Sequence, residues 1–332
     1  MQVMRNNTDC SEMEGSVTER IGNKVLNGEK ITREEALILY EQPLEGLCAK
    51  ADEIRKHFCG KQFDICTIIN GKSGKCSENC KFCAQSAHHH TGAAEYPLLP
   101  EEEILAEARK NDAQGIMRYS IVTSGKRLSD AEVDEMCRVI RRIRQETGLS
   151  VCVSFGLLNE AQYRRLKEAG AQRVHNNLET SERNFPNVCT THSFQDKVAA
   201  IRAAQAAGLE VCSGGIMGLG ETVEDRIDMA LSIRELGVKS VPVNLLNPIP
   251  GTPLEKNDRL SQDEMRKIVA VYRFIIPDGF IRLAGGRGLM DDKGRKCFES
   301  GANAAISGDM LTTAGISVKT DQKLLREIGY EL

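Results

Sequence analysis

The sequence is organised around the stretch Gly71–Gln85, GKSGKCSENCKFCAQ, which follows a short apolar run. Its three cysteines, Cys76, Cys80 and Cys83, have the spacing C-x3-C-x2-C. Three thiolates can hold three irons of a [4Fe–4S] cluster, and the neighbouring sequence supplies no obvious fourth ligand. The open iron is then free to bind a substrate or cosubstrate. If the apolar run is the first strand of a barrel, the cysteines lie at its catalytic, carboxyl-terminal face.

A structural zinc site is the alternative interpretation of these cysteines. Zinc prefers four ligands, and the run His88–His90 could supply one of them. The surrounding residues favour the iron–sulfur cluster instead. Gly71 and Gly74 allow the backbone to wrap closely around a cluster, which a closed zinc site would not need. Phe82, just before the third cysteine, could shield the cluster and pack against a planar ligand.

From about residue 60 onwards, short apolar runs alternate with longer amphipathic stretches, which indicates βαβ units and a parallel sheet. The predicted strands are Phe63–Ile69, Ile116–Val122, Ser150–Ser154, Arg173–Leu178, Glu210–Met217, Ser240–Leu245, Phe280–Leu283 and Ala304–Ile306. The predicted helices between them are Glu101–Lys110, Asp130–Thr147, Glu160–Ala169, Gln195–Ala207, Val223–Leu236, Gln262–Phe274 and Lys293–Gly301. About eight strands predict an α/β fold, a closed (β/α)8 barrel of the TIM type. An open doubly wound sheet is the structural alternative.

Three segments are expected along the chain. Residues 1–60 are polar and helical in pattern, and Thr32–Glu35 forms a capping-box motif at the start of one helix. Residues 61–320 form the barrel. Residues 321–332 form a helical tail.

The composition excludes several classes of protein. Among 332 residues, 41% are hydrophobic, 27% are charged, and the net charge is −3, so no broad basic field favours nucleic acid or a membrane surface. The chain has no 18-residue apolar run, and its first twenty residues have no signal-peptide pattern, so we expect a cytoplasmic protein. Twelve cysteines in a chain of this size do not indicate a secreted disulfide scaffold. Cys10, Cys48, Cys59 and Cys137 lie in no metal-binding spacing and are expected to be small buried hydrophobes.

Cys76, Cys80, Phe82 and Cys83 together resemble the hallmark motif of the radical S-adenosylmethionine superfamily. The resemblance implies that the open iron chelates the amino and carboxylate groups of S-adenosylmethionine. An electron from the cluster then breaks the C5′–S bond and gives methionine and a 5′-deoxyadenosyl radical, which abstracts hydrogen from an unreactive C–H bond. A closed barrel suits this chemistry because it keeps water away from the radical.

Five blocks, in this order and spacing, resemble the biotin synthase family from about residue 30 to the end of the chain. They are TIINGKSGKCSENCKFCAQS, HNNLETS, VCSGGIMGLGET, VPVNLLNPIPGTPL and IRLAGGR. The resemblance implies that a glycine turn packs beside the adenine of the cosubstrate; its residues are Gly214, Ile216, Gly218 and Glu221. It also implies that Asn177 and Asn244 bind substrate, and that Glu179, where the family usually has aspartate, contacts the ribose. Asn177 and Glu179 are expected to alternate on the fourth strand and to point the same way.

Family members of the well-known type carry a second, [2Fe–2S] cluster deeper in the barrel, held by three cysteines and an arginine. The resemblance assigns three of these positions to Cys152, Cys212 and Arg282. The fourth departs from the pattern, because Ser120 stands where that type has cysteine, and a serine oxygen is a poorer iron ligand than a thiolate. We hypothesise that Cys189 compensates and that Cys152, Cys189 and Cys212 hold an altered auxiliary cluster. A buried loop thiol is the alternative for Cys189.

The implied reaction is a radical sulfur transfer that converts dethiobiotin to biotin. The radical removes hydrogen at C9 and then at C6, and the auxiliary cluster supplies the sulfur. Such enzymes are homodimers that take electrons from flavodoxin or ferredoxin. A hydrogenase cofactor maturase and a methylornithine synthase are the nearest rivals, and a non-catalytic metal-binding scaffold is the alternative from another class. Lys197 stands where the common type has arginine near the cosubstrate; the sequence assigns it no role, and a surface helix lysine is the plain interpretation.

Overall fold

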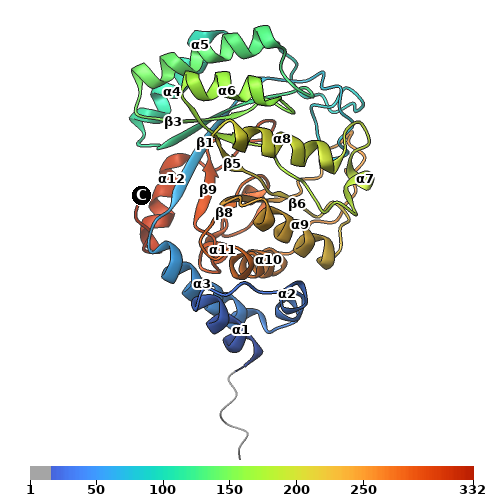
Figure 1. Ribbon diagram of the computed structural model, residues 1–332, viewed down its shortest axis with the longest axis vertical. Coiled ribbons are helices and arrows are strands. Elements are labelled where there is room, and N and C mark those ends of the chain that lie inside the picture. The colour runs from blue at the N-terminus through green and yellow to red at the C-terminus, as the bar shows by residue number, and fades with distance from the viewer. Residues whose placement is uncertain (1–15) are drawn as a thin grey trace, which may run out of the picture.

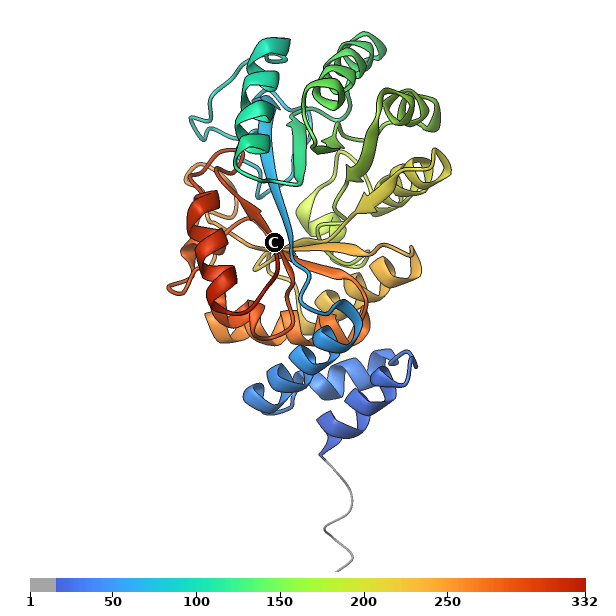
Figure 2. The same ribbon diagram turned by 90° about the vertical axis from the view of Figure 1, so that its left-hand side faces the viewer.

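The computed structural model describes residues 16–332, and the strands in this part of the chain form a closed parallel barrel (Figures 1 and 2). The strands are β1 Asp64–Lys72, β2 Arg118–Thr123, β3 Ser150–Ser154, β4 Ala171–His175, β5 Glu210–Cys212, β6 Gly215–Met217, β7 Ser240–Leu245, β8 Phe280–Leu283 and β9 Ala304–Ser307. Their order is β5-β4-β3-β2-β1-β9-β8-β7-β6, and a further β5–β7 pairing closes the ring. The predicted TIM-type fold is confirmed, and the open doubly wound sheet is excluded.

Helices surround the strands on the outside of the barrel (Figure 2). The barrel helices are α4 Glu101–Ala113, α5 Asp130–Glu146, α6 Glu160–Ala169, α7 Phe185–Val188, α8 Phe194–Ala206, α9 Val223–Glu235, α10 Gln262–Ile275, η2 Arg287–Leu289, α11 Arg295–Phe298 and α12 Val318–Glu327. Their apolar residues form one continuous core with the outward faces of the strands. The predicted helix Lys293–Gly301 shortens to the single turn of α11.

Three helices precede the barrel: α1 Val17–Leu26, α2 Arg33–Tyr40 and α3 Leu44–Cys59. They pack at one side of the barrel against α9 and α10 (Figure 1). The capping box expected at Thr32 and Glu35 is present, with Glu35 N donating to Thr32 Oγ1 and Thr32 N donating to the Glu35 carboxylate.

Two local features of the strands differ from the prediction. The predicted strand Glu210–Met217 divides into β5, which pairs with β4, and β6, which pairs with β7. At Gly214, between them, a Cβ atom would lie 1.9 Å from the carbonyl oxygen of Pro242. The predicted strand Arg173–Leu178 ends at His175. Glu179 has a left-handed backbone with φ of 71°, so the expectation that Asn177 and Glu179 lie on the fourth strand is wrong.

The four cysteines expected to be structural have different settings. Cys48 and Cys137 are buried, as expected, and Cys59 is half-buried. Cys10 lies outside the described residues.

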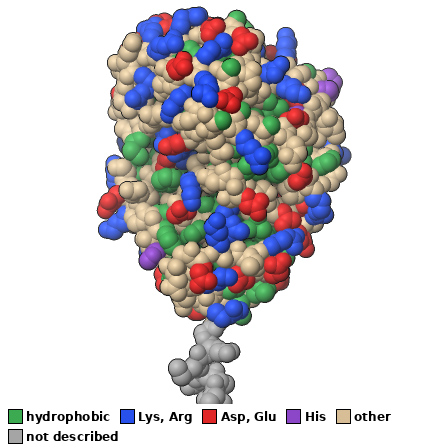
Figure 3. Space-filling view, in the orientation of Figure 1, with side chains coloured by type: hydrophobic (Ala, Val, Ile, Leu, Met, Phe, Trp, Pro, Cys, Tyr) green, Lys and Arg blue, Asp and Glu red, His purple; other side chains and the backbone are tan. Residues whose placement is uncertain are grey.

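The molecular surface carries charges of both signs. On the face shown in Figure 3, Lys and Arg side chains are interspersed with Asp and Glu. Across residues 16–332, no helix combines the length and the apolar character needed to span a membrane.

Arg273 of α10 joins the closing strands of the barrel from a fully buried position. Its guanidinium donates to the carbonyl oxygens of Gly301 (2.9 Å) and Gly279 (2.8 Å) and to Oδ1 of Asn303 (2.7 Å). These acceptors lie directly before β8 and β9. This one side chain of α10 therefore fixes the positions at which β8 and β9 begin.

We predict that Arg273→Ala lowers the free energy of unfolding by about 3 kcal/mol, because buried acceptors lose their donor. Arg164→Ala is the matched control, since among residues 16–332 this exposed arginine pairs only with Glu160 of its own helix, and such pairs contribute about 0.5 kcal/mol or less. Urea unfolding followed by far-UV circular dichroism measures both, since the chain has no tryptophan. Equal losses in the two variants would contradict this role of Arg273.

Candidate active site

The cysteine loop begins where β1 ends and is shaped by its own backbone. Gly74 and Lys75 have positive φ values of 74° and 47° and turn the chain back. Cys76 N then donates to Gln85 O (3.0 Å), and Cys83 N donates to Cys80 O (3.0 Å). The loop thus gathers the three predicted cluster cysteines, all half-buried, at the carboxyl ends of the strands. Three thiols gathered on one loop fit a [4Fe–4S] cluster with one open iron.

The histidine run does not complete a zinc site. His88 and His89 bind backbone instead, with ring nitrogens 3.1 Å from the carbonyl oxygens of Ser77 and Cys80. Among residues 16–332, the side chains that meet at metal-ligand spacing are Cys80, Cys189 and His192. Cys76 and Cys83 are not part of that group, so the zinc interpretation of the C-x3-C-x2-C motif has no support.

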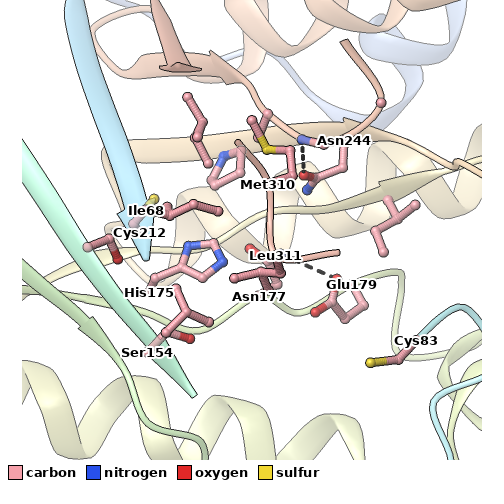
Figure 4. A pocket seen from close by; sticks show the side chains of 18 of the residues that line it. Ile68, Cys83, Ser154, His175, Asn177, Glu179, Cys212, Asn244, Met310 and Leu311 are labelled. Atoms are coloured by element: carbon pink, nitrogen blue, oxygen red, sulfur yellow. Dashed lines mark hydrogen bonds between the residues drawn. The ribbon is translucent and has the colours of Figure 1, made fainter. Parts of the chain in front are cut away.

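A cavity of about 370 Å³ fills the barrel interior and runs from this loop toward the amino ends of the strands. In Figure 4, the labelled side chains Cys83, Glu179, Asn177, His175 and Cys212 follow one another across it. The sequence-predicted site residues that line the cavity are Phe82, Cys83, Cys152, Asn177, Glu179, Cys212, Ile216, Asn244 and Arg282. Most of the predicted residues therefore face one common space.

The glycine turn shapes the cavity wall, mostly without facing the cavity. Ile216 lines the space, whereas Gly214, Gly218 and Glu221 do not. The buried carboxylate of Glu221 accepts from Gly218 N (2.8 Å) and Arg226 Nε (2.8 Å). Glu221 therefore holds the turn in place, and a flat ligand would approach the backbone of the turn at Ile216.

The two predicted substrate asparagines are fixed by backbone hydrogen bonds. Asn177 Oδ1 accepts from Gly214 N (3.1 Å), and Asn244 binds the backbone of Gly215 and Gly285. Asn177 also donates to the Glu179 carboxylate at 3.3 Å. These bonds leave each amide in one orientation toward the cavity.

Lys197, to which the sequence assigned no role, also lines the cavity. Burial raises the pKa of Glu179, and the charge of Lys197 opposes that shift. Lys197 comes from α8 and faces the mouth of the cavity, beside the cysteine loop. It is the cation placed to meet an anionic group of a ligand there.

Three buried thiols lie deep in the cavity: Cys66 of β1, Cys152 of β3 and Cys212 of β5, here called the floor thiols. Burial raises the pKa of Cys66, and the charges of the other two thiols add to the increase. Burial also acts on Cys212, but His175, Arg282 and Arg173 together lower its pKa to about 7. Ser120 lines the same cavity beside Cys152, its partner in the β2–β3 register.

Cys66 was missed from the sequence, although a signal for it exists. Residues of a strand alternate between two faces, so Cys66 shares the inward face of β1 with Asp64 and Ile68. Applying the same alternation to β3 and β5 selects Cys152 and Cys212. The signal is therefore three inward-facing cysteines on three different strands. Cys66 was missed because no other cysteine lies near it in sequence at a metal-binding spacing.

The structure does not bring Cys189 together with Cys152 and Cys212, as the sequence analysis had hypothesised. Cys189 does not line the cavity, and its sulfur lies within 4.8 Å of the Cys80 sulfur and of a ring nitrogen of His192. The segment after α7 folds back over the cysteine loop rather than over the barrel interior. Cys189 therefore belongs to the surroundings of the first cysteine loop.

An ion network lies beneath the floor thiols. Asp64 pairs with Arg118 (3.4 Å), Arg173 (3.4 Å) and Arg282 (3.1 Å), which come from β2, β4 and β8. Burial raises the pKa of Asp64, but the three guanidinium groups outweigh it and bring the pKa to about 2. Arg173 also pairs with Glu210 (2.8 Å), so the network contains three guanidinium groups and two carboxylates. The excess positive charge fits an anionic cluster on the floor thiols.

The fold and the cysteine loop define a class of enzyme. Residues 72–233 match the family described as the Radical SAM superfamily, and residues 242–331 match the Biotin and Thiamin Synthesis associated domain. A solved structure of methylornithine synthase superposes with a TM-score of 0.82 and covers 94% of this chain and 96% of its own, at 22% identity, which supports the same fold.

Relatives of known name narrow the class. Biotin synthase of Akkermansia muciniphila is 60% identical over 96% of this chain and 99% of its own. Biotin synthase of Brachyspira hyodysenteriae is 58% identical over 95% of this chain and 94% of its own. The chain therefore belongs to the biotin synthase family of radical S-adenosylmethionine enzymes.

The ion network generates a stability prediction. Asp64→Asn leaves three buried guanidinium groups without their shared carboxylate, so the free energy of unfolding at neutral pH should fall by about 3 kcal/mol. Asp278→Asn, which removes an exposed pair with Lys239, is the control and should change it by about 0.5 kcal/mol or less. Urea unfolding of each variant measures both.

The pH dependence follows from the lowered pKa of Asp64. A carboxylate with a folded pKa of about 2, below its usual 3.8, stabilises the fold above pH 3.8 and loses that effect as the pH falls toward 2. The gap between the native chain and Asp64→Asn should stay constant from pH 7 to about 4 and narrow below. A gap that narrows between pH 7 and 5 would show that Asp64 is not held ionised by the arginines.

Proposed function

We propose that this chain converts dethiobiotin to biotin by radical sulfur insertion, with S-adenosylmethionine as cosubstrate. One observation carries the proposal: a single cavity joins the C-x3-C-x2-C loop at its mouth to three buried thiols at its floor. A reaction that needs a radical source and a sulfur source on opposite sides of one substrate requires this arrangement. Membership of the biotin synthase family supports the same assignment.

When bound, a [4Fe–4S] cluster and S-adenosylmethionine would supply the carbon-centred radical, and an auxiliary iron–sulfur cluster would supply the sulfur. The chain's own residues hold and orient the reactants. Cys76, Cys80 and Cys83 would hold the first cluster. Phe82 and Ile216 offer apolar surfaces to the adenine of the cosubstrate at the cavity mouth.

Two charged side chains are assigned to the polar parts of S-adenosylmethionine. Glu179 is placed to accept from the ribose hydroxyl groups, and Lys197 to meet the carboxylate. The Glu179 side chain is one methylene longer than the aspartate usual in the family. The left-handed backbone at Glu179 determines the direction in which its carboxylate points.

The substrate position lies between the two cysteine sets. Backbone hydrogen bonds hold the side-chain amides of Asn177 and Asn244 in place. The remaining hydrogen-bond donors and acceptors of each amide therefore point in a fixed direction. The ureido ring of dethiobiotin has the donors and acceptors that such amides recognise. Ile68, Val122 and Leu311 supply apolar wall, which keeps water from the reacting carbons.

We further propose that the auxiliary cluster is bound by the floor thiols, Cys66, Cys152 and Cys212. Cys66 thus takes the part that the sequence analysis gave to Cys189, and it replaces the cysteine absent at Ser120. Two nitrogen-bearing side chains lie near the remaining position. Arg282 is paired with Asp64, and that pairing raises its pKa against the effect of burial, so it would face the cluster as a cation rather than as a ligand. His175, beside Cys212, has a ring nitrogen to offer.

The proposal also covers the oligomeric state, the location, the electron donor and the domain boundaries of the protein. The family resemblance supports a homodimer in the cytoplasm that receives electrons from flavodoxin or ferredoxin. The boundaries 1–60, 61–320 and 321–332 remain our proposed division of the chain, with α1–α3 before the barrel and α12 near its end. The rival activities, methylornithine synthesis and hydrogenase cofactor maturation, leave the floor thiols without a use.

The test compares three cysteine variants of the anaerobically reconstituted protein. Cys66→Ala should lose the auxiliary iron, keep the first cluster, and form 5′-deoxyadenosine from S-adenosylmethionine without biotin. Cys189→Ala should keep the iron of both clusters. Cys137→Ala, at a buried thiol of α5 far in sequence from either loop, is the control. Iron analysis, Mössbauer spectra, and mass spectrometry of deoxyadenosine and biotin measure these outcomes.

Two outcomes would contradict the proposal. If Cys66→Ala makes biotin with unchanged iron content, Cys66 does not hold the sulfur source. If the native chain forms deoxyadenosine but no biotin from dethiobiotin, the radical chemistry stands and the substrate is wrong.

A further inference from the structure

The segment after α7 is bound to the first cysteine loop, although the two are more than a hundred residues apart in sequence. The hydrogen bonds between them are Lys81 N to Val188 O (3.0 Å), Asn79 N to Thr191 Oγ1 (3.1 Å), Thr190 N to Asn79 Oδ1 (2.9 Å) and Thr191 Oγ1 to Glu78 Oε2 (2.8 Å). Backbone and side chains of both segments take part. The contact therefore fixes any side chain of residues 188–192 relative to the cluster cysteines.

Cys189 is the side chain that this contact places next to a cluster ligand. It is 3% exposed, and its sulfur lies within 4.8 Å of both the Cys80 sulfur and a His192 ring nitrogen. Cys80 is the middle cysteine of the C-x3-C-x2-C motif. A thiol at this position has no access to substrate and does not face the barrel cavity.

The thiol hydrogen of Cys189 has few acceptors besides Cys80. Asn79 Oδ1 is 3.4 Å away but already accepts from the backbone of Thr190 (2.9 Å) and Thr191 (3.3 Å). His192 Nδ1 is 3.3 Å away, but it lies 2.6 Å from the carboxylate of Glu78. A carboxylate only accepts, so this nitrogen carries the hydrogen and cannot accept another.

Thr191 Oγ1, at 3.4 Å, is the remaining neutral oxygen near Cys189. An iron-bound thiolate is charged, and hydrogen bonds to charged acceptors are about twice as strong as neutral ones. Once Cys80 binds iron, its sulfur is therefore the preferred acceptor for the Cys189 thiol.

We propose that Cys189 is a positioning residue that donates its S–H hydrogen to the Cys80 thiolate and so raises the reduction potential of the first cluster. Reduction adds an electron to an already anionic cluster, and a donor to one of its sulfurs stabilises the reduced form more than the oxidised form. Cleavage of S-adenosylmethionine starts from that reduced form. The inference rests on the proposed function only in its first step, the presence of a [4Fe–4S] cluster on Cys76, Cys80 and Cys83.

The experiment measures reduction of that cluster in the full-length reconstituted enzyme, without dethiobiotin. Its reduced form is recognised as the electron paramagnetic resonance signal that changes when S-adenosylmethionine is added. At a fixed applied potential, Cys189→Ala should lower the ratio of reduced to oxidised cluster about tenfold, equivalent to about 59 mV for one electron. Cys189→Ser, which retains an O–H donor, should restore most of the ratio. Cys137→Ala should match the native chain.

Three results would overturn the inference. The first is an unchanged ratio in Cys189→Ala. The second is a loss of first-cluster iron in Cys189→Ala comparable with the loss in Cys80→Ala, which would make Cys189 a ligand. The third is the absence of any signal that responds to S-adenosylmethionine in the native chain, which would also remove the proposed radical chemistry. Failure to form biotin alone leaves the inference intact, because this measurement does not involve dethiobiotin.

Discussion

The interior of this barrel depends on one buried interaction, the pairing of Asp64 with three arginines. Buried charges are expensive unless they are paired, and here a single carboxylate serves guanidinium groups from β2, β4 and β8. The pairing ties four strands together at one end of the cavity. It also leaves positive charge facing the floor thiols, which apolar packing could not supply. A TIM barrel normally fills this region with branched apolar side chains. Here polar and charged side chains take that place, as the proposed anionic cluster would require.

The two ends of the cavity are built by different means. At the mouth, a loop with two left-handed residues gathers Cys76, Cys80 and Cys83, and the segment after α7 binds its outer side. At the floor, rigid strands place Cys66, Cys152 and Cys212 by simple alternation. Asn177 and Glu179 lie between them on backbone that has left the regular ladder after β4, whereas Asn244 belongs to β7. This division suits an open coordination site at the mouth and an enclosed, water-excluding site below it.

Much of the fold could be predicted from the sequence because its signals are local. Alternating apolar runs gave the strands closely, and the capping box at Thr32 and Glu35 is present. The cysteine loop was recognisable because its ligands are close in sequence. The floor thiols are not, and Cys66 was overlooked because only the closed barrel brings it to Cys152 and Cys212. Cys189 was misplaced for the converse reason: it follows β4 in sequence, but the chain returns to the cysteine loop.

The central claim is that sulfur held on the floor thiols enters the product. The most direct test is to reconstitute the protein anaerobically with sulfide labelled with heavy sulfur, remove free sulfide, and allow one turnover with S-adenosylmethionine, reductant and dethiobiotin. The biotin formed should carry the heavy isotope. Biotin with sulfur of natural isotopic composition would show that the sulfur comes from elsewhere and would contradict the assignment of the floor thiols.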